Sequence, residues 1–394
     1  MTSSTALHTD PPDVASPDSD DAVLVVRDLR VSFHANTSLV PVVRGVDFEL
    51  HPGKTLGIVG ESGSGKSVTC LALMGLLPRA RTSISGDVRL GERHLLHMSE
   101  RELQDVRGKK MGMIFQDPMT SLNPFMRVGR QLSEMLEVHE GLSRRQAKRR
   151  ALELMERVGI PDTGARYQHH PHQFSGGMRQ RLMIAMALLT RPKVLIADEP
   201  TTALDVTIQA QILELIRGLA ADFGTAVLFI THDLGVVAGI ADEVMVMYAG
   251  RAVEKAPVRQ LFASPQHPYT RGLLQAVPKL YEGGPLIAIP GAPPQPHALP
   301  SGCAFRPRCR YAHDGCAEDI PPPVHTADGR MLACPVVEKA PFPTLLDDLV
   351  PTTPPPVQTS LDLDDDLHAL PDEGEADAER PPREFQDDDP EVGS

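Results

Sequence analysis

Short apolar runs alternate with longer amphipathic segments along the chain from Val23 to about Lys255. Apolar runs of the kind that buried parallel strands show lie at 55–59, 110–115, 194–197 and 227–230. Segments with helical periodicity lie at 68–77, 143–158, 178–189 and 205–222. Further strand-like runs lie at 23–26, 42–50, 243–248 and 251–254, with a long loop expected at 34–40. The alternation predicts an α/β fold with a mixed sheet that has antiparallel strands at its edge.

Composition changes at both ends of the chain and again after Pro257. Ser, Asp and Pro are frequent at the start, Pro, Gly, His and Cys follow Pro257, and the last residues are rich in Pro and then in Asp and Glu. Segments with little apolar surface cannot offset the entropy lost on ordering. The predicted organisation is a disordered tail at 1–22, the α/β domain at 23–256, a small module at 257–340 and a disordered acidic tail at 341–394.

The net charge of −13 comes from the ends of the chain. Residues 341–394 carry 16 acidic and 2 basic side chains, and residues 1–22 carry five Asp and neither Lys nor Arg. The remaining body is mildly basic, too weakly so to indicate a nucleic-acid partner. No apolar run approaches the ~18 residues that span a bilayer, and the N-terminus lacks the apolar core of a signal peptide. We therefore expect a cytoplasmic protein that reaches a membrane only through partners.

A glycine-rich segment joins the strand at 55–59 to the helix at 68–77, which is the context that a Walker A motif requires. Glycines let backbone N–H groups turn inward around phosphates, and the following helix adds the positive end of its dipole. Lys66 is expected to reach the β- and γ-phosphates of ATP, and the Ser67 hydroxyl to bind Mg²⁺. The residues predicted to hold ATP here are Gly60, Glu61, Ser62, Gly63, Ser64, Gly65, Lys66, Ser67 and Val68.

Two acidic residues, Asp198 and Glu199, follow the apolar run at 194–197. A parallel sheet presents the ends of its strands to the ligand crevice. Asp198 is expected to hold Mg²⁺, and Glu199 to polarise the attacking water as general base. Acids at a strand end also occur as plain solvated residues, but downstream of a phosphate loop they indicate a catalytic pair.

A second glycine-containing turn precedes the helix at 178–189. Ser175 can cap this helix, and Gly176 and Gly177 let its backbone approach an anion. With Met178, the turn resembles the signature motif of the ATPase subunits of ABC transporters. Three further motifs occur in the order that this family has: the Q-loop at Gln116 before the signature turn, and the D-loop at Ala203-Leu204-Asp205 and the switch histidine at His232 after it.

The resemblance implies the P-loop NTPase fold of an ABC ATPase domain, with a helical subdomain. It also implies that ATP lies between two nucleotide-binding domains arranged head to tail. Ser175, Gly176, Gly177 and Met178 would then contact the γ-phosphate held by a partner, with Asp205 close by. His232 would assist Glu199, while Gln116 would complete the Mg²⁺ shell with Ser67 and Asp198. Phe33 is the candidate for stacking on adenine.

Two longer segments resemble a narrower family. Residues 113–124 resemble the extended Q-loop of oligopeptide and dipeptide importers, and 264–274, which contains His267-Pro268-Tyr269, resembles the start of their C-terminal extension. The resemblance covers about 23–340. It implies an ATPase subunit that drives peptide uptake from the cytoplasmic face of the membrane. The implied partners are two permease subunits, a paralogous ATPase that completes a heterodimer and, indirectly, an extracytoplasmic binding protein.

Other functions stay open. Nickel or glycosides are alternative cargoes of similar ATPases. A soluble ABC ATPase that acts on DNA or ribosomes is a second class, although the chain has neither a long coiled-coil insertion nor tandem ATPase halves. A third is a non-catalytic module that senses iron or redox state, which the intact Glu199 and His232 disfavour.

Four of the five cysteines gather in the predicted C-terminal module, at Cys303, Cys309, Cys316 and Cys334. In a reducing cytosol such a cluster more often binds metal than forms disulfides. Structural zinc usually uses Cys pairs two to four residues apart, and this cluster has none. Four thiolates near Arg306 and Arg308 fit a [4Fe–4S] cluster better. The resemblance implies the same, because similar extensions carry such clusters, with zinc and unligated thiols as alternatives.

Overall fold

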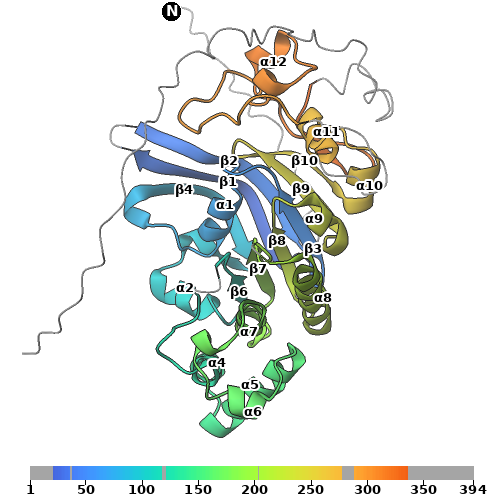
Figure 1. Cartoon of the computed structure of the whole chain (residues 1–394). Coiled ribbons are helices and arrows are strands. Elements are labelled where there is room, and N and C mark those ends of the chain that lie inside the picture. The colour runs from blue at the N-terminus through green and yellow to red at the C-terminus, as the bar shows by residue number, and fades with distance from the viewer. Residues whose placement is uncertain (1–20, 36–37, 118–120, 203, 277–287, 336–394) are drawn as a thin grey trace, which may run out of the picture. The chain divides into compact units, whose positions relative to one another are not determined.

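The computed structural model describes residues 21–35, 38–117, 121–202, 204–276 and 288–335 (Figure 1). Most of the two predicted tails, at 1–22 and 341–394, lies outside these residues. The boundaries of the predicted domains therefore stay predictions.

A mixed sheet forms the centre of the described fold. Within the described residues it has eight strands in the order β11-β12-β10-β9-β3-β8-β7-β6. The strands from β9 to β6 are parallel to their neighbours, whereas β10, β11 and β12 pair antiparallel at the edge. The bounds are β3 (Thr55–Val59), β6 (Met111–Ile114), β7 (Val194–Asp198), β8 (Ala226–Ile230), β9 (Glu243–Tyr248), β10 (Arg251–Pro257), β11 (Val324–His325) and β12 (Met331–Leu332). The prediction of a mixed sheet with antiparallel edge strands is confirmed.

An antiparallel sheet lies beside the central one, with the order β2-β1-β4-β5 among the described strands (Figure 1). Its strands are β1 (Leu24–Ala35), β2 (Ser38–Leu50), β4 (Thr82–Leu90) and β5 (Arg93–His94). Because β1 and β2 form a long hairpin, the expected loop at 34–40 is wrong for its described residues. Strand β4 was not predicted. Its alternation is interrupted at Gly86, where φ is +116° and the strand passes close to the Asp28 carbonyl.

Helix α1 (Lys66–Leu73) packs between the two sheets. Its buried Cys70, Ala72 and Leu73 share one core with side chains from β1, β3 and β8. This packing fixes the N-terminus of α1, and with it the end of the phosphate loop, against the central sheet.

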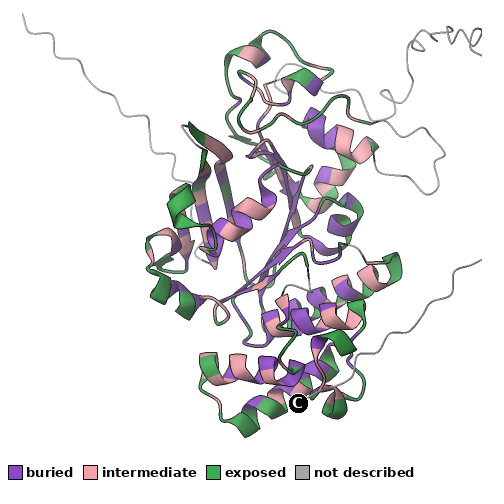
Figure 2. Ribbon diagram, turned by 60° about the vertical axis from the view of Figure 1, so that its left-hand side comes forward, coloured by how far each residue is buried: buried purple, intermediate pink, exposed green. Residues whose placement is uncertain are grey.

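The helical part of the fold gathers around α4, α5 and α7, and its buried faces meet in one core (Figure 2). Ser143 caps α5 in a capping box with Gln146. None of the helices in the described ranges has both the length and the apolar character needed to cross a membrane. The bounds are α2 (Glu100–Val106), α4 (Val128–Glu140), α5 (Arg144–Arg157), α6 (Thr163–Arg166), α7 (Gly176–Leu188), α8 (Val206–Phe223) and α9 (Leu234–Ile240).

The C-terminal part of the described chain adds α10 (Val258–Ala263), α11 (Pro268–Gln275) and α12 (Gly315–Glu318). Tyr269, Leu261 and Phe305 pack with Tyr248 and Val253 of the hairpin β9–β10 into a third core. Strand β12 pairs with β10, so this part of the chain extends the central sheet.

Candidate functional site

A cavity of about 600 Å³ opens where the phosphate loop meets the ends of the central strands. Its walls contain all the predicted phosphate-loop residues from Glu61 to Val68, together with the predicted Gln116, Glu199 and His232. Val42 and Thr202, which the sequence analysis did not single out, complete the lining. Segments far apart in the sequence thus meet in one cavity with room for a nucleotide triphosphate.

The phosphate loop has the backbone that its glycines allow. Gly60 and Gly65 have φ values of +152° and +98°, which side-chain-bearing residues rarely adopt. A Cβ at Gly60 would also lie 2.2 Å from the carbonyl oxygen of Met247. The loop therefore tolerates no larger residue at Gly60, because the neighbouring strand occupies that space.

Lys66 points into the loop that precedes it. Its Nζ donates to the carbonyl oxygens of Gly60, at 2.7 Å, and Glu61, at 3.1 Å. Burial lowers the pKa of Lys66, while the nearby Glu199, Asp198 and Glu61 act in the opposite direction. The ammonium group therefore lies in a site that is poor in water and would gain from a phosphate partner.

Ser67 and Asp198 meet at the start of α1. The Ser67 hydroxyl donates to the Asp198 carboxylate at 3.0 Å. Burial raises the pKa of Asp198, and this hydrogen bond opposes the rise. Two oxygen ligands are thus adjacent, which suits a hard cation such as Mg²⁺.

Glu199 follows β7 in a left-handed backbone conformation, with φ +47°. Such strain in a non-glycine residue costs of order 1 kcal/mol and is found most often at functional sites. The Glu199 carboxylate lies 3.3 Å from Gln116 Nε2 and 3.3 Å from His232 Nδ1, and it accepts a hydrogen bond from Thr202 Oγ1 at 3.0 Å. The predicted catalytic residues Glu199, Gln116 and His232 are thus brought together.

The predicted signature turn lies elsewhere. Ser175 caps α7 by accepting from the Met178 N–H, and Ser175 and Gly176 are exposed. Asp205 caps α8 in the same way, through Ile208 N at 2.9 Å. A Cβ at Gly177 would touch Ile208 at 3.4 Å, so the signature turn lies beside the first turn of α8, the helix that Asp205 caps. Neither segment contributes a described residue to the lining of the cavity.

Phe33 is not among the described residues that line the cavity. It lies on β1, paired with Val40 and Thr82, and packs against the core between the two sheets. Val42 lines the cavity instead. The adenine contact predicted for Phe33 stays a prediction.

The four clustered cysteines do not form a preassembled metal site. None is in a disulfide, and the described residues, which include all four, hold no group of three His, Cys, Asp or Glu placed to bind a metal ion. Burial raises the pKa of Cys303, and raises that of Cys309 to about 11. Arg308, expected to offset the charge of a cluster, instead forms an ion pair with Glu61 at 2.6 Å.

Comparisons with known proteins agree with this arrangement. Residues 43–202 match the family model described as ABC transporter. Residues 253–316 match the model described as oligopeptide/dipeptide transporter, C-terminal region. Among solved structures, the dimeric post-hydrolysis state of the ATP-binding cassette MJ0796 bound to ADP and Pi has a TM-score of 0.54 and 25% identity, covering 60% of this chain and 99% of that chain.

Curated relatives are closer in sequence. The oligopeptide transport ATP-binding protein OppD of Salmonella typhimurium is 52% identical over 320 residues, which are 81% of this chain and 95% of that protein. OppD of Bacillus subtilis is 54% identical over 309 residues, which are 78% of this chain and 86% of that protein. The chain therefore belongs to the family of ABC transporter ATP-binding proteins with the oligopeptide/dipeptide transporter C-terminal region.

Proposed function

We propose that the protein is the ATP-hydrolysing subunit of an ABC importer and powers the uptake of peptides. One observation carries the proposal: the phosphate loop, Gln116, Glu199 and His232 surround a single cavity of about 600 Å³. The relatives named above are oligopeptide transport proteins, which supports peptides as the cargo.

The proposed chemistry assigns each group a role. Backbone N–H groups of the phosphate loop and Lys66 bind the β- and γ-phosphates of ATP. Glu199 takes the proton of the attacking water as general base, and His232, next to Glu199, contacts the γ-phosphate and assists it. Gln116 senses the nucleotide through its contact with Glu199, at 3.3 Å.

The donor set fits the Mg²⁺ that the family uses. Ser67, Asp198 and Gln116 would hold the ion, and the adjacency of Ser67 and Asp198 supports this choice. Bound Mg²⁺ would neutralise charge on the phosphates. The protein's own contribution is to present oxygen ligands at the start of α1.

A second ATPase chain would complete the site. The signature turn, with Ser175 and Gly176 exposed, lies outside the chain's own cavity and would cap ATP bound by that partner. Val206, next to Asp205, is 83% exposed, as an interface residue of a lone chain would be. A head-to-tail heterodimer with a paralogous ATPase satisfies both features.

The segment after Gln116 would contact the permease subunits at the cytoplasmic face of the membrane. Phe125 in this segment is 89% exposed, although it is large and apolar. Asn123 holds its backbone, because Asn123 Oδ1 accepts from Phe125 N at 3.0 Å and Gln131 binds Asn123 in turn. An apolar side chain displayed on an ordered turn suits a protein partner.

The proposal is tested in the assembled transporter. A tagged chain is purified in detergent, and two permease subunits and a second ATPase are expected to accompany it. In proteoliposomes that hold this complex and its binding protein, labelled peptide is expected to accumulate only with ATP inside the compartment that faces the ATPases. Transport of nickel or of a glycoside in place of peptide would redirect the cargo, and a chain that purifies without membrane subunits would favour a soluble ABC ATPase.

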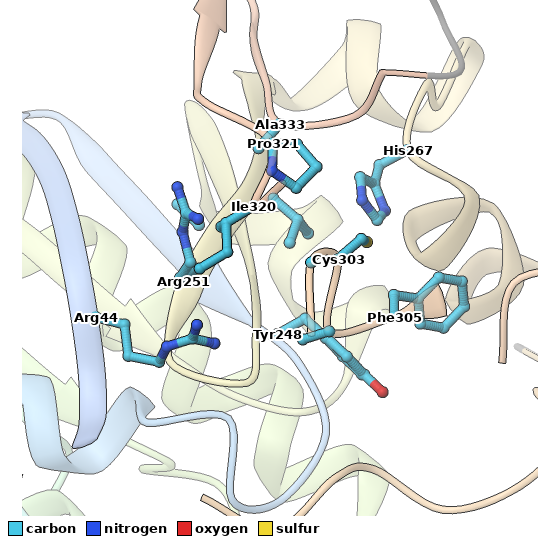
Figure 3. A pocket seen from close by; sticks show the side chains of 13 residues that line it. Arg44, Tyr248, Arg251, His267, Cys303, Phe305, Ile320, Pro321 and Ala333 are labelled. Carbon is cyan, nitrogen blue, oxygen red and sulfur yellow. The ribbon is translucent and has the colours of Figure 1, made fainter. Parts of the chain in front are cut away.

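We also propose that Cys303, Cys309, Cys316 and Cys334 bind a [4Fe–4S] cluster after local rearrangement of their loops. Cys303 and Cys309 are close enough to Cys316 for their charges to interact, and the Cys303 N–H donates to the Cys316 carbonyl oxygen at 2.8 Å. A small cavity beside Cys303 is also lined by Ala333, the neighbour of Cys334 (Figure 3).

Two cations border the same small cavity. Figure 3 shows Arg44 and Arg251 on the wall of the cavity that Cys303 also lines. Burial lowers the pKa of both arginines, and repulsion from the nearby Arg30 adds to this effect. An anionic cluster would relieve this cost. Absorbance near ~400 nm with iron in protein purified without oxygen would support the cluster. Its loss in Cys303→Ser but not in Cys70→Ala would assign the ligands, and stoichiometric zinc or bare thiols would refute the proposal.

A further inference from the structure

Glu61 is held at three different atoms. Its N–H donates to the Tyr269 hydroxyl at 2.9 Å, its carbonyl oxygen accepts from Lys66 at 3.1 Å, and its carboxylate accepts from Arg308. The Arg308 pair is bidentate, with Nη1 at 2.6 Å and Nη2 at 2.9 Å. Glu61 is the second residue of the phosphate loop, so two residues from beyond position 257 contact the start of this loop.

The arginine side of this contact is built into the fold. The side chain of Arg308 is 4% exposed and that of Glu61 is 28% exposed. Arg308 also donates from Nε to the Pro290 carbonyl oxygen at 3.0 Å and from Nη1 to the Tyr248 hydroxyl at 3.4 Å. A planar guanidinium with this many fixed partners has little freedom to swing away, and bidentate pairs of this kind are among the stronger hydrogen bonds.

Packing and hydrogen bonds also fix the position of Tyr269. It is fully buried and packs against Tyr248 and Phe305. Its N–H donates to His267 Nδ1 at 3.1 Å, which starts α11. His267 N in turn donates to the buried carboxylate of Glu254 at 2.9 Å, so the hydroxyl that faces Glu61 is fixed through β10.

We propose that Arg308 and Tyr269 are positioning residues of the ATP site, through which the C-terminal region sets the affinity of the phosphate loop for nucleotide. This inference rests on the proposed function, because it concerns the same ATP site. Neither residue lines the cavity, so each acts through Glu61. With Glu61 fixed, the loop is preorganised, and less conformational entropy is lost when ATP binds.

The test is an equilibrium titration of the full-length chain with the fluorescent analogue mant-ATP. Arg308→Ala is expected to weaken binding about tenfold, the effect of losing a charged hydrogen-bonded pair, and Arg308→Lys by less. Tyr269→Phe, which keeps the ring, is expected to weaken binding about threefold. In the assembled transporter, KM for ATP should rise while kcat changes by less than about twofold, because uniform binding is lost.

Three controls separate positioning from general damage. Arg310→Ala removes an exposed arginine of the same loop and should bind like the wild type. Thermal unfolding should show that each variant is folded. In a double-mutant cycle, Arg308→Ala should have little further effect once Glu61→Gln has removed the carboxylate charge.

Different results would contradict the positioning role and the ATP site itself. Folded Arg308→Ala and Tyr269→Phe proteins that bind mant-ATP as tightly as Arg310→Ala would overturn the inference, as would full additivity in the cycle. The ATP site itself would be in question only if Lys66→Ala also left binding intact.

Discussion

The phosphate loop and the signature turn are both glycine-containing segments that precede a helix, yet the structure treats them in opposite ways. The phosphate loop is held by contacts with several parts of the chain. Lys66 donates to the Gly60 carbonyl oxygen, and the Met247 backbone packs against Gly60. Arg308 and Tyr269 form hydrogen bonds with Glu61. In the signature turn, by contrast, Ser175 and Gly176 are exposed. The Ser175 side chain caps α7 by accepting a hydrogen bond from the Met178 N–H.

This difference separates a segment that contacts within its own chain hold in place from a segment that stays exposed. A loop that must wrap a triphosphate before hydrolysis gains from being preorganised within its own chain. In the proposed heterodimer, a surface that meets the second ATPase only when both carry nucleotide would gain from staying exposed. Changes in the two segments should therefore separate nucleotide binding from hydrolysis.

The largest effect is expected from Glu199→Gln. Without the general base, hydrolysis in the transporter should fall by about 10²–10⁴-fold. ATP should still bind, because the phosphate loop is intact, and the ATP-bound chains should stay associated. Phosphate release and size-exclusion chromatography with ATP measure the two quantities, and turnover close to that of the wild type would remove Glu199 from its role.

Lys66→Ala should impair the phosphate loop and therefore nucleotide binding. Loss of the buried ammonium is expected to weaken ATP binding about 10–100-fold, the range for losing a hydrogen bond to a charged group. Mant-ATP titration of the single chain is the measurement. Arg310→Ala is the matched removal of one exposed cation, and equal affinities for the two variants would contradict the assignment.

Ser175→Ala should impair the signature turn and therefore hydrolysis rather than binding. The isolated chain should bind ATP with unchanged affinity, because Ser175 lies outside its own cavity. Hydrolysis in the complex is expected to fall about tenfold, since one hydrogen bond to a charged phosphate is lost. A loss of ATP affinity in the single chain would show that the two segments are not separate in the way described.

The smallest effect is expected from Thr202→Val, which keeps the shape of the side chain and removes the hydroxyl that donates to Glu199. The carboxylate should lose one fixed partner, and kcat should fall about threefold with little change in KM. Steady-state kinetics of the transporter give both constants. A larger loss of ATP affinity than of kcat would show that Thr202 contributes to nucleotide binding rather than to hydrolysis.

Much of the core and of the ATP site follows from local sequence. The apolar runs at 55–59, 194–197 and 227–230 become β3, β7 and β8, because parallel strands buried on both faces need continuous apolar side chains. Gly60, Lys66 and Glu199 follow from spacing, since the chemistry needs them at fixed distances from a strand end.

Other features depend on contacts that no local pattern records. Arg308 and Glu61 are 247 positions apart and meet only because the C-terminal region packs on the hairpin β9–β10. Val42 belongs to the strand predicted at 42–50, but no local pattern indicates that β2 brings its side chain to the cavity. The cysteine spacing identified four thiols as candidate ligands, but it could not show whether the loops bring these thiols together.

The pairing of β12 with β10 has a consequence for any shortened form of the protein. Glu254 and Lys255 of β10 lie opposite Leu332 and Met331. A chain that stopped at residue 256 would bare the backbone donors and acceptors of an outermost strand, next to an apolar surface that Tyr269 and Phe305 now cover. Bare strands of this kind recruit other strands. Such a truncated chain should therefore self-associate. It would also lack Arg308 and Tyr269, which are proposed to set the affinity of the phosphate loop for nucleotide.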